Sequence, residues 1–122
     1  MKTLSSLKVL VVEDEALVSM LVEDMLTDLG CAIVGPAAEI EEALKLAGSA
    51  DIDAALLDVN LGGRPIFPVA DALKARGVPF AFASGYGEAG LTEDHKGATV
   101  LQKPFREADL RRVLETLVTQ TA

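Results

Sequence analysis

The sequence is poor in aromatic residues and in cysteine. It contains no Trp, one Tyr and four Phe in 122 residues, while half of its residues are apolar and most of these are Ala, Val and Leu. Small and branched aliphatic side chains favour helices packed closely on a sheet over a β-sandwich. A single cysteine, Cys31, cannot form an internal disulfide, which excludes a disulfide scaffold and leaves Cys31 as a small core residue.

Basic residues and long apolar runs are also scarce. The formal net charge is −8 at pH 7, which argues against direct binding to nucleic acid or to an anionic membrane. No apolar run is long enough to cross a bilayer, and residues 1–6 lack the apolar segment of a signal peptide. We therefore expect a cytoplasmic protein that binds a cation or another protein.

The length of 122 residues suits one domain over residues 1–122 with one core. Hydrophobic periodicity predicts strands that alternate with helices along the chain. The predicted strands cover residues 7–12, 31–35, 52–58, 79–84 and 98–102. The predicted helices cover residues 18–29, 40–47, 66–73 and 110–118. Gly35-Pro36 is expected to end the second strand, and the composition of residues 60–65 predicts a loop.

Residues 85–97 have the weakest pattern, because four glycines stand there among polar residues. We expect a marginal helix or a mobile loop in this segment. The fourth helix of the alternation, which would lie between the fourth and fifth strands, is therefore expected to be weak or absent. The alternation elsewhere predicts a doubly wound α/β fold, with a five-stranded parallel sheet and helices on both faces. Right-handed crossovers then bring the carboxyl ends of all strands to one edge. No linker, repeat or second domain is expected.

Acidic residues, a hydroxyl and an amine follow four of these strands. In chain order they are Glu13, Asp14, Asp58, Ser84 and Lys103. Three crowded carboxylates repel one another, and a divalent cation resolves the repulsion. Mg²⁺, or Mn²⁺ in its place, accepts oxygen ligands of this kind.

The roles of these ligands follow from their positions. We expect Asp14 and Asp58 to bind the cation directly and Glu13 to bind it through a water. The main-chain carbonyl of Asn60 would complete the protein ligands. Taken alone, the acids after the first strand would serve equally well to cap the first helix.

A carboxylate beside Mg²⁺ can also act as a nucleophile, and formation of an aspartyl phosphate is one such use. Phosphoryl transfer requires that the charge on three equatorial oxygens be neutralised. We expect the cation to take one oxygen, Lys103 the second, and the Ser84 hydroxyl with nearby backbone N–H groups the third. Asp58 as phospho-acceptor then explains why the other groups collect at this edge. Singly, Lys103 could be a surface lysine and Ser84 a turn residue.

Four stretches carry these residues, namely Val11-Val12-Glu13-Asp14-Glu15, Leu56-Leu57-Asp58-Val59-Asn60-Leu61, Ala83-Ser84-Gly85 and Lys103-Pro104-Phe105. With this spacing, the chain resembles the receiver domain of bacterial two-component response regulators over essentially its whole length. The resemblance implies a flavodoxin-like (β/α)5 fold and a phospho-acceptor at Asp58. It implies phosphate contacts from Ser84 and Lys103, and a Lys103-Pro104 bond that is often cis. It also implies a Mg²⁺ site, made by Glu13, Asp14, Asp58 and the Asn60 carbonyl.

Family members take a phosphoryl group from a histidine kinase or a phosphotransfer protein and hydrolyse it slowly. The resemblance therefore implies a signalling protein and not an enzyme. We expect no output domain after the final helix, and we therefore expect the protein to bind a downstream protein target, or to serve as a phosphate sink or shuttle. The final helix is a candidate face for a partner or a homodimer. A chain cut from a larger regulator would look the same.

Two features depart from the family pattern. The position on the fifth strand that usually carries Tyr or Phe is Val100, which puts the usual hydroxyl-plus-aromatic switch in doubt. Residues 82–87 resemble a sub-group whose fourth strand ends in Phe-Ala-Thr-Gly and whose fourth helix is often poorly formed. Our hypothesis is that phosphorylation orders residues 85–97, with Tyr86 near the site entrance. Unchanged hydrogen exchange there on addition of beryllofluoride would reject it.

Three other functions are weighed against this one. A phosphohydrolase of the haloacid dehalogenase type needs a second acid where this chain has Asn60, and it needs a cap domain. A nucleotide- or flavin-binding module needs a glycine-rich loop where Glu13-Asp14-Glu15 stands. A pseudo-receiver that is never phosphorylated is disfavoured, because Asp14, Asp58, Ser84 and Lys103 are all present.

Overall fold

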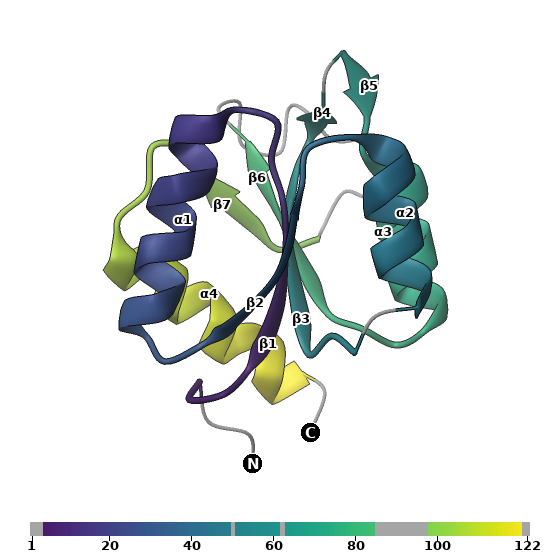
Figure 1. The fold of residues 1–122 in the computed structure, drawn as a ribbon. Helices are drawn as coiled ribbons and strands as arrows, with labels where there is room; N and C mark the ends of the chain where they lie inside the picture. The colour runs from purple at the N-terminus through teal and green to yellow at the C-terminus, as the bar shows by residue number, and fades with distance from the viewer. Residues whose placement is uncertain (1–3, 50, 62, 85–97, 121–122) are drawn as a thin grey trace.

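A computed structural model describes residues 4–49, 51–61, 63–84 and 98–120, and Figure 1 shows its fold. The strands are β1 (Lys8–Val12), β2 (Ala32–Ala37), β3 (Ala54–Asp58), β4 (Asn60–Leu61), β5 (Arg64–Pro65), β6 (Phe80–Ser84) and β7 (Val100–Gln102). The helices are α1 (Ala16–Asp28), α2 (Ile40–Ser49), α3 (Phe67–Ala75) and α4 (Glu107–Gln120). The weak fourth helix that the sequence predicts, and its proposed ordering, fall on residues 85–97, which lie outside the described residues.

Five of the strands form one parallel sheet in the order β2-β1-β3-β6-β7. Helices α1 and α4 cover one face of this sheet, and α2 and α3 cover the other (Figure 1). This is the doubly wound, flavodoxin-like α/β fold that the sequence predicts. Because the strand order reverses between β1 and β3, the carboxyl ends of these two strands border the crevice where open α/β sheets bind ligands.

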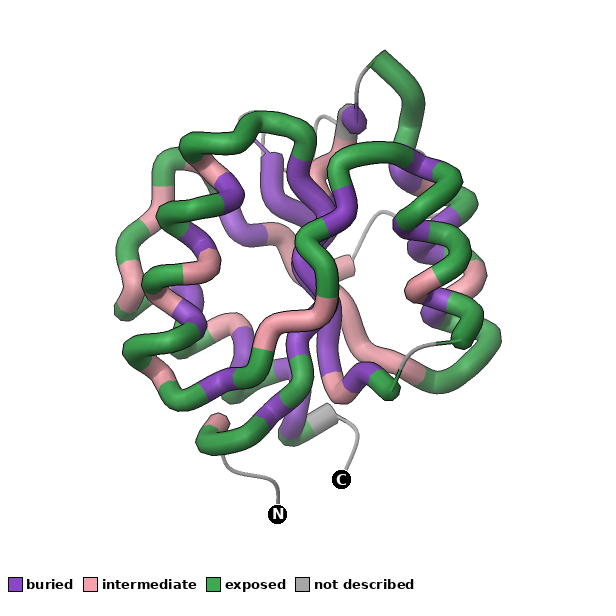
Figure 2. The backbone as a smooth tube through the Cα atoms, in the orientation of Figure 1, coloured by how far each residue is buried: buried purple, intermediate pink, exposed green. Residues whose placement is uncertain are grey.

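Each strand of the sheet sends alternate side chains to opposite faces. In β1, Val9 and Val11 pack under α1 and α4, whereas Leu10 and Val12 pack under α2 and α3. Figure 2 shows that burial is concentrated in the strands and on the inner sides of the helices. Burial on both faces explains why the strands read as uninterrupted apolar runs in the sequence.

The second strand does not end at Gly35-Pro36, contrary to our prediction. β2 continues through both residues to Ala37, with a shift in register along β1 between Leu10 and Val12. Gly35 has a φ of 91°, which glycine adopts readily, and β2 is an edge strand, where proline is tolerated. The longer strand also reaches the residue after β1, because the Ala37 carbonyl accepts the N–H of Glu13 at 3.0 Å.

Residues 60–65 form a short antiparallel hairpin and not the predicted loop. Asn60 pairs with Pro65 and Leu61 pairs with Arg64, so that β4 and β5 stand out beyond the carboxyl edge of the sheet in Figure 1. Gly63, which directly precedes β5, has a φ of 83°, a value that glycine adopts readily. Composition indicated the turn correctly but did not reveal that its flanking residues pair.

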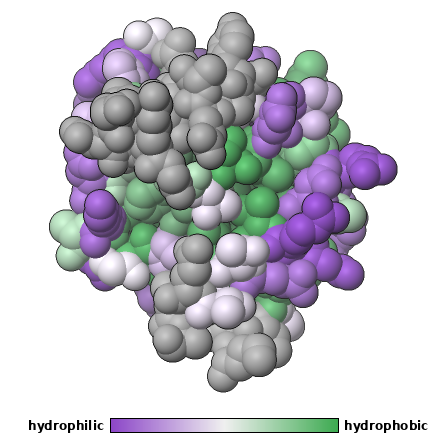
Figure 3. Space-filling model, turned by 180° about the vertical axis from the view of Figure 1, so that it is seen from behind, coloured by the Kyte–Doolittle hydropathy of each residue, from purple (hydrophilic) through white to green (hydrophobic). Residues whose placement is uncertain are grey.

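Three further features concern the surface beside β6 and β7, the single cysteine and the length of the helices. β6 and β7 lie at the back of Figure 1, and the view from behind in Figure 3 shows apolar residues in the middle of this side and hydrophilic residues along its margins. Cys31 is buried, as predicted, and burial raises the pKa of its thiol. Within the described part of the chain, no helix is long and apolar enough to span a bilayer.

Candidate functional site

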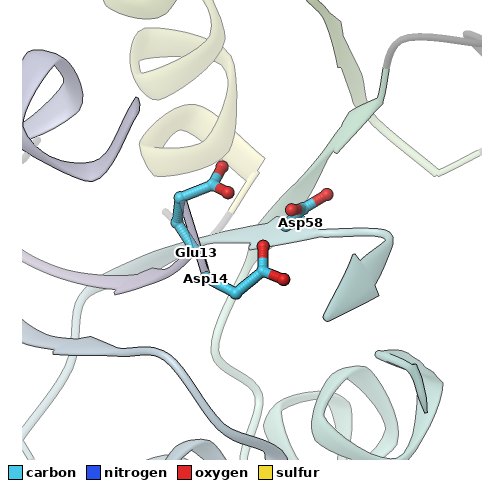
Figure 4. A group of neighbouring side chains, drawn as sticks. All are labelled: Glu13, Asp14 and Asp58. Atoms are coloured by element: carbon cyan, nitrogen blue, oxygen red, sulfur yellow. The ribbon is translucent and has the colours of Figure 1, made fainter. Parts of the chain in front are cut away.

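Three carboxylates meet at the carboxyl ends of β1 and β3. Each of Glu13, Asp14 and Asp58 offers an oxygen, and these oxygens all lie within 4.8 Å of one another; the side chains converge in Figure 4. Glu13 is only 5% exposed, whereas Asp14 stands at the surface. β1 and β3 are paired neighbours, with Val12 opposite Leu57. The crowding therefore follows from the register of the sheet.

Strand alternation sends charged side chains to one side of the sheet at this edge. Asp58 continues the side of Leu56 in β3, and Lys103 continues the side of Leu101 after β7. Both leucines pack in the cluster under α1 and α4. Glu13 follows the same alternation at the end of β1. A carboxylate from each of two strands and an amine from a third thus face the same space.

Lys103 connects two of the carboxylates. Its Nζ lies 2.9 Å from Oε1 of Glu13 and 3.5 Å from Oδ2 of Asp58. Its backbone N–H donates to the Ser84 carbonyl at 2.9 Å, which holds the end of β7 beside β6. The Lys103-Pro104 peptide bond is cis, as the resemblance implies.

The surroundings of Lys103 raise the pKa of its ammonium group above the ordinary lysine value. Burial is the largest single influence and acts in the opposite direction, because it disfavours the charged form. The hydrogen bond to Glu13 and the negative charges of Asp58 and Glu13 together outweigh burial. Lys103 is therefore a cation at neutral pH.

Glu13 is held through both of its side-chain oxygens. Oε1 accepts a hydrogen bond from Lys103, and Oε2 accepts the backbone N–H of Glu15 at 3.1 Å. Glu15 directly precedes α1, a position where backbone N–H groups have no partner within the helix. The sequence suggested a water-mediated role for Glu13 but did not predict its pair with Lys103. No sequence pattern relates two residues that are 90 positions apart.

Ser84 and Asn60 lie beside the carboxylates on their own elements. Ser84 ends β6, one residue after Ala83, which is opposite Asp58 in the sheet register. Alternation places Ser84 on the side of Phe82, which packs under α2 and α3. Ser84 and Lys103 therefore leave the sheet on opposite sides at this edge. Asn60 begins the β4–β5 hairpin directly after Val59.

The donor set suits a hard divalent cation. Glu13, Asp14 and Asp58 present carboxylate oxygens within one small region, and Mg²⁺ prefers oxygen ligands of this kind. Because both Glu13 oxygens already accept hydrogen bonds, from Lys103 and from the Glu15 N–H, Asp14 and Asp58 are the better candidates for direct ligands. The Asn60 carbonyl is the backbone ligand that the sequence predicts for the same site.

An apolar groove borders the site along α1. Its volume is about 360 Å³, and it is lined by Val18, Leu21, Val22, Met25, Lys103, Pro104 and Phe105. Leu17, Met20 and Leu21 on the same helix are all more than half exposed. Leu21 stays exposed because the apolar stripe of α1 is wider than the face that the sheet covers. The groove itself was not predicted.

Comparison with known proteins gives one family. The family model described as the response regulator receiver domain matches residues 9–115. The phyllosphere-induced regulator PhyR of Methylorubrum extorquens is 33% identical over 111 residues, which are 88% of this chain and 42% of PhyR. The transcriptional regulatory protein PdtaR of Mycobacterium tuberculosis is 31% identical over 117 residues, which are 93% of this chain and 57% of PdtaR. The chain spans about half the length of these curated relatives.

Solved structures give the same fold over nearly the whole chain. The solution structure of SdrG from Sphingomonas melonis Fr1 is 38% identical, with a TM-score of 0.81, and the match covers 96% of this chain and 99% of SdrG. The receiver domain of the sensor histidine kinase PA1611 from Pseudomonas aeruginosa PAO1 is 26% identical, with a TM-score of 0.78, and the match covers 94% of this chain and 99% of that domain. That structure is described with a magnesium ion coordinated in its active-site cleft.

Proposed function

The chain belongs to the response regulator receiver domain family, and from this premise we propose that it accepts a phosphoryl group on Asp58 from a histidine kinase or a phosphotransfer protein. The observation that carries the proposal is the position of the Lys103 ammonium group, 3.5 Å from Asp58 at the edge where three carboxylates meet. A strand-end aspartate that lies beside a protonated lysine and an acidic metal site is suited to phosphoryl transfer.

Asp58 acts as the nucleophile in this proposal. One of its carboxylate oxygens forms a bond to phosphorus while the bond from phosphorus to the donor's imidazole nitrogen breaks, and the electron pair of that bond stays on the imidazole. Lys103 neutralises charge that spreads over the phosphoryl oxygens in the transition state. The Ser84 hydroxyl donates a hydrogen bond to another oxygen from the opposite side. Glu13 keeps the Lys103 amine protonated and directed at the site.

The acidic residues would hold the cation. Asp14, Asp58 and the Asn60 carbonyl would bind Mg²⁺ or Mn²⁺ directly, with Glu13 bound through a water. When bound, the cation supplies positive charge for a phosphoryl oxygen and relieves repulsion among the carboxylates.

The donor protein must seat close enough to bring its phosphohistidine to Asp58. The groove along α1 meets this requirement, because Lys103 both lines the groove and contacts Asp58. Leu17 and Met20 extend the apolar surface beyond the groove, as expected for a surface that another protein covers. We propose that this surface binds an apolar patch on the donor protein, next to the donor's phosphohistidine.

After phosphorylation the chain binds a downstream protein or drains phosphate from a kinase as a sink or shuttle. A homodimer formed through α4 is one form that the signal could take. We propose a cytoplasmic location, in keeping with a single cysteine that is free and buried.

The proposal is tested by incubation with acetyl phosphate and Mg²⁺, followed by intact mass measurement. Wild type should gain one phosphoryl group and Asp58→Asn should gain none. Asp53→Asn, at the opposite end of β3, is the matched control and should gain one. An equal gain in Asp58→Asn, or a modification mapped to another residue, would overturn the proposal. Release of many equivalents of phosphate from small esters would instead indicate a phosphohydrolase.

A further inference from the structure

The β4–β5 hairpin is attached firmly at its base. Leu61 and Ile66 are 2% and 0% exposed, and both belong to the core cluster under α2 and α3. The N–H of Ile66 donates to the Val59 carbonyl at 3.1 Å, which closes the hairpin directly after Asp58. Any movement of the hairpin therefore changes the backbone next to the proposed phospho-acceptor.

An ion pair joins the outer strand of the hairpin to α2. Nη1 of Arg64 donates to Oε2 of Glu41, and both side chains are more than half exposed. Arg64 is opposite Leu61 in the hairpin, and Asn60 is the next residue along that strand. Glu41 lies in the first turn of α2, between the sheet-facing residues Ile40 and Ala43. The ion pair thus ties the hairpin to a helix that is itself anchored in the core.

We propose that Glu41 and Arg64 are positioning residues for the cation site. Their ion pair holds the β4–β5 hairpin so that the Asn60 carbonyl is directed toward the cation held by Asp14 and Asp58. This inference rests on the proposed function, because that function makes Asn60 a ligand. Glu41 and Arg64 act through the backbone of the hairpin and not by contact with the cation.

The direction in which Mg²⁺ affinity changes when Arg64 is replaced distinguishes this positioning role from a purely electrostatic effect. Removing the positive charge of Arg64 near a cation site should by itself tighten Mg²⁺ binding. Loss of the ion pair should instead weaken Mg²⁺ binding. In part of the metal-free population the Asn60 carbonyl would then not be directed toward the site. An exposed ion pair shifts such a local equilibrium by about two- to fivefold, and the change in Kd should lie in this range.

The experiment is isothermal titration of Mg²⁺ into the full chain at low ionic strength. Arg64→Gln should raise the Kd by about two- to fivefold. Arg64→Lys keeps the charge and should recover most of the affinity, and Glu41→Arg combined with Arg64→Glu should restore the pair with unchanged net charge. Lys8→Gln breaks a comparable exposed pair with Asp51 at the start of β1 and should not raise the Kd.

A second measurement does not depend on the cation. Hydrogen exchange at the Ile66 N–H should be faster in metal-free Arg64→Gln than in wild type. A Kd that is unchanged or lowered in Arg64→Gln overturns the inference, whether or not exchange is faster. If wild type binds no Mg²⁺, the cation site of the proposed function fails together with this inference. If wild type binds Mg²⁺ and is phosphorylated while Arg64→Gln behaves identically, this inference alone fails.

Discussion

The Lys103 ammonium group forms a 2.9 Å ion pair with the buried carboxylate of Glu13. A buried carboxylate is strongly unfavourable unless it is paired and hydrogen-bonded, and Lys103 supplies that partner from the far end of the chain. The same ammonium group lies 3.5 Å from Asp58. The stability of the domain and the proposed chemistry at Asp58 therefore both depend on the ammonium group of Lys103.

The pKa of Lys103 predicts how stability changes at high pH. Its folded-state pKa is raised above 10.5, so its contribution is fully present below that ordinary value and is lost as pH rises through the raised value. The difference in unfolding free energy between wild type and Lys103→Gln should therefore be constant up to about pH 10 and shrink above it. Chemical denaturation across this range measures the difference, and a constant difference at still higher pH would contradict the prediction.

Removal of the Lys103 charge should change stability and cation binding in opposite directions. Lys103→Ala leaves Glu13 without its ammonium partner, which should lower the unfolding free energy of the metal-free protein by about 1–3 kcal/mol. The same change increases the negative charge at the site and should tighten Mg²⁺ binding by at least about threefold. Thermal unfolding and calorimetric titration measure the two effects. Lys8→Ala is the control, because Lys8 begins β1 at the end opposite Glu13. Weaker Mg²⁺ binding in Lys103→Ala would contradict the prediction.

Gly35 should tolerate no side chain. A Cβ at this position would lie 2.9 Å from the backbone nitrogen of Ala37, and the residue has a φ of +91°. Gly35→Ala should therefore lower the unfolding free energy by about 2–4 kcal/mol. Gly77→Ala is the matched control, because Gly77 also has a positive φ but no atom within 4 Å of an added Cβ, and it should cost about 1 kcal/mol. Equal losses in urea denaturation would show that the contact with Ala37 has no effect.

The groove along α1 predicts a defect that only a protein donor reveals. Leu21→Glu places a charge on a side chain that is 59% exposed and lines the groove, so folding should be preserved. Phosphorylation by a cognate kinase or phosphotransfer protein should slow about tenfold or more, since a buried charge at an interface is unfavourable. Phosphorylation by acetyl phosphate should not change. Leu44→Glu on α2 is the control, and equal rates for the two variants with the protein donor would contradict the docking assignment.

Local pattern was sufficient for most elements of the fold. The run Ala54–Asp58 predicted a strand buried on both faces, and the structure confirms it. The same reasoning failed at Gly35-Pro36, because local propensity does not reveal that β2 lies at the edge of the sheet, where a proline is tolerated. Helical spacing identifies the apolar stripe of α1 but not how much of that stripe the sheet covers, so it does not reveal that Leu21 is exposed.

The sequence by itself determined which residues end β1, β3, β6 and β7 at the carboxyl edge, because periodicity, turn residues and side-chain alternation are local properties of the chain. Only the tertiary structure decided that the Lys103 amine pairs with Glu13 as well as approaching Asp58, that Leu61 pairs with Arg64, and that Arg64 reaches Glu41. Contacts of this kind depend on the order, register and packing of elements that are distant in sequence. These three properties are determined together when the whole core forms.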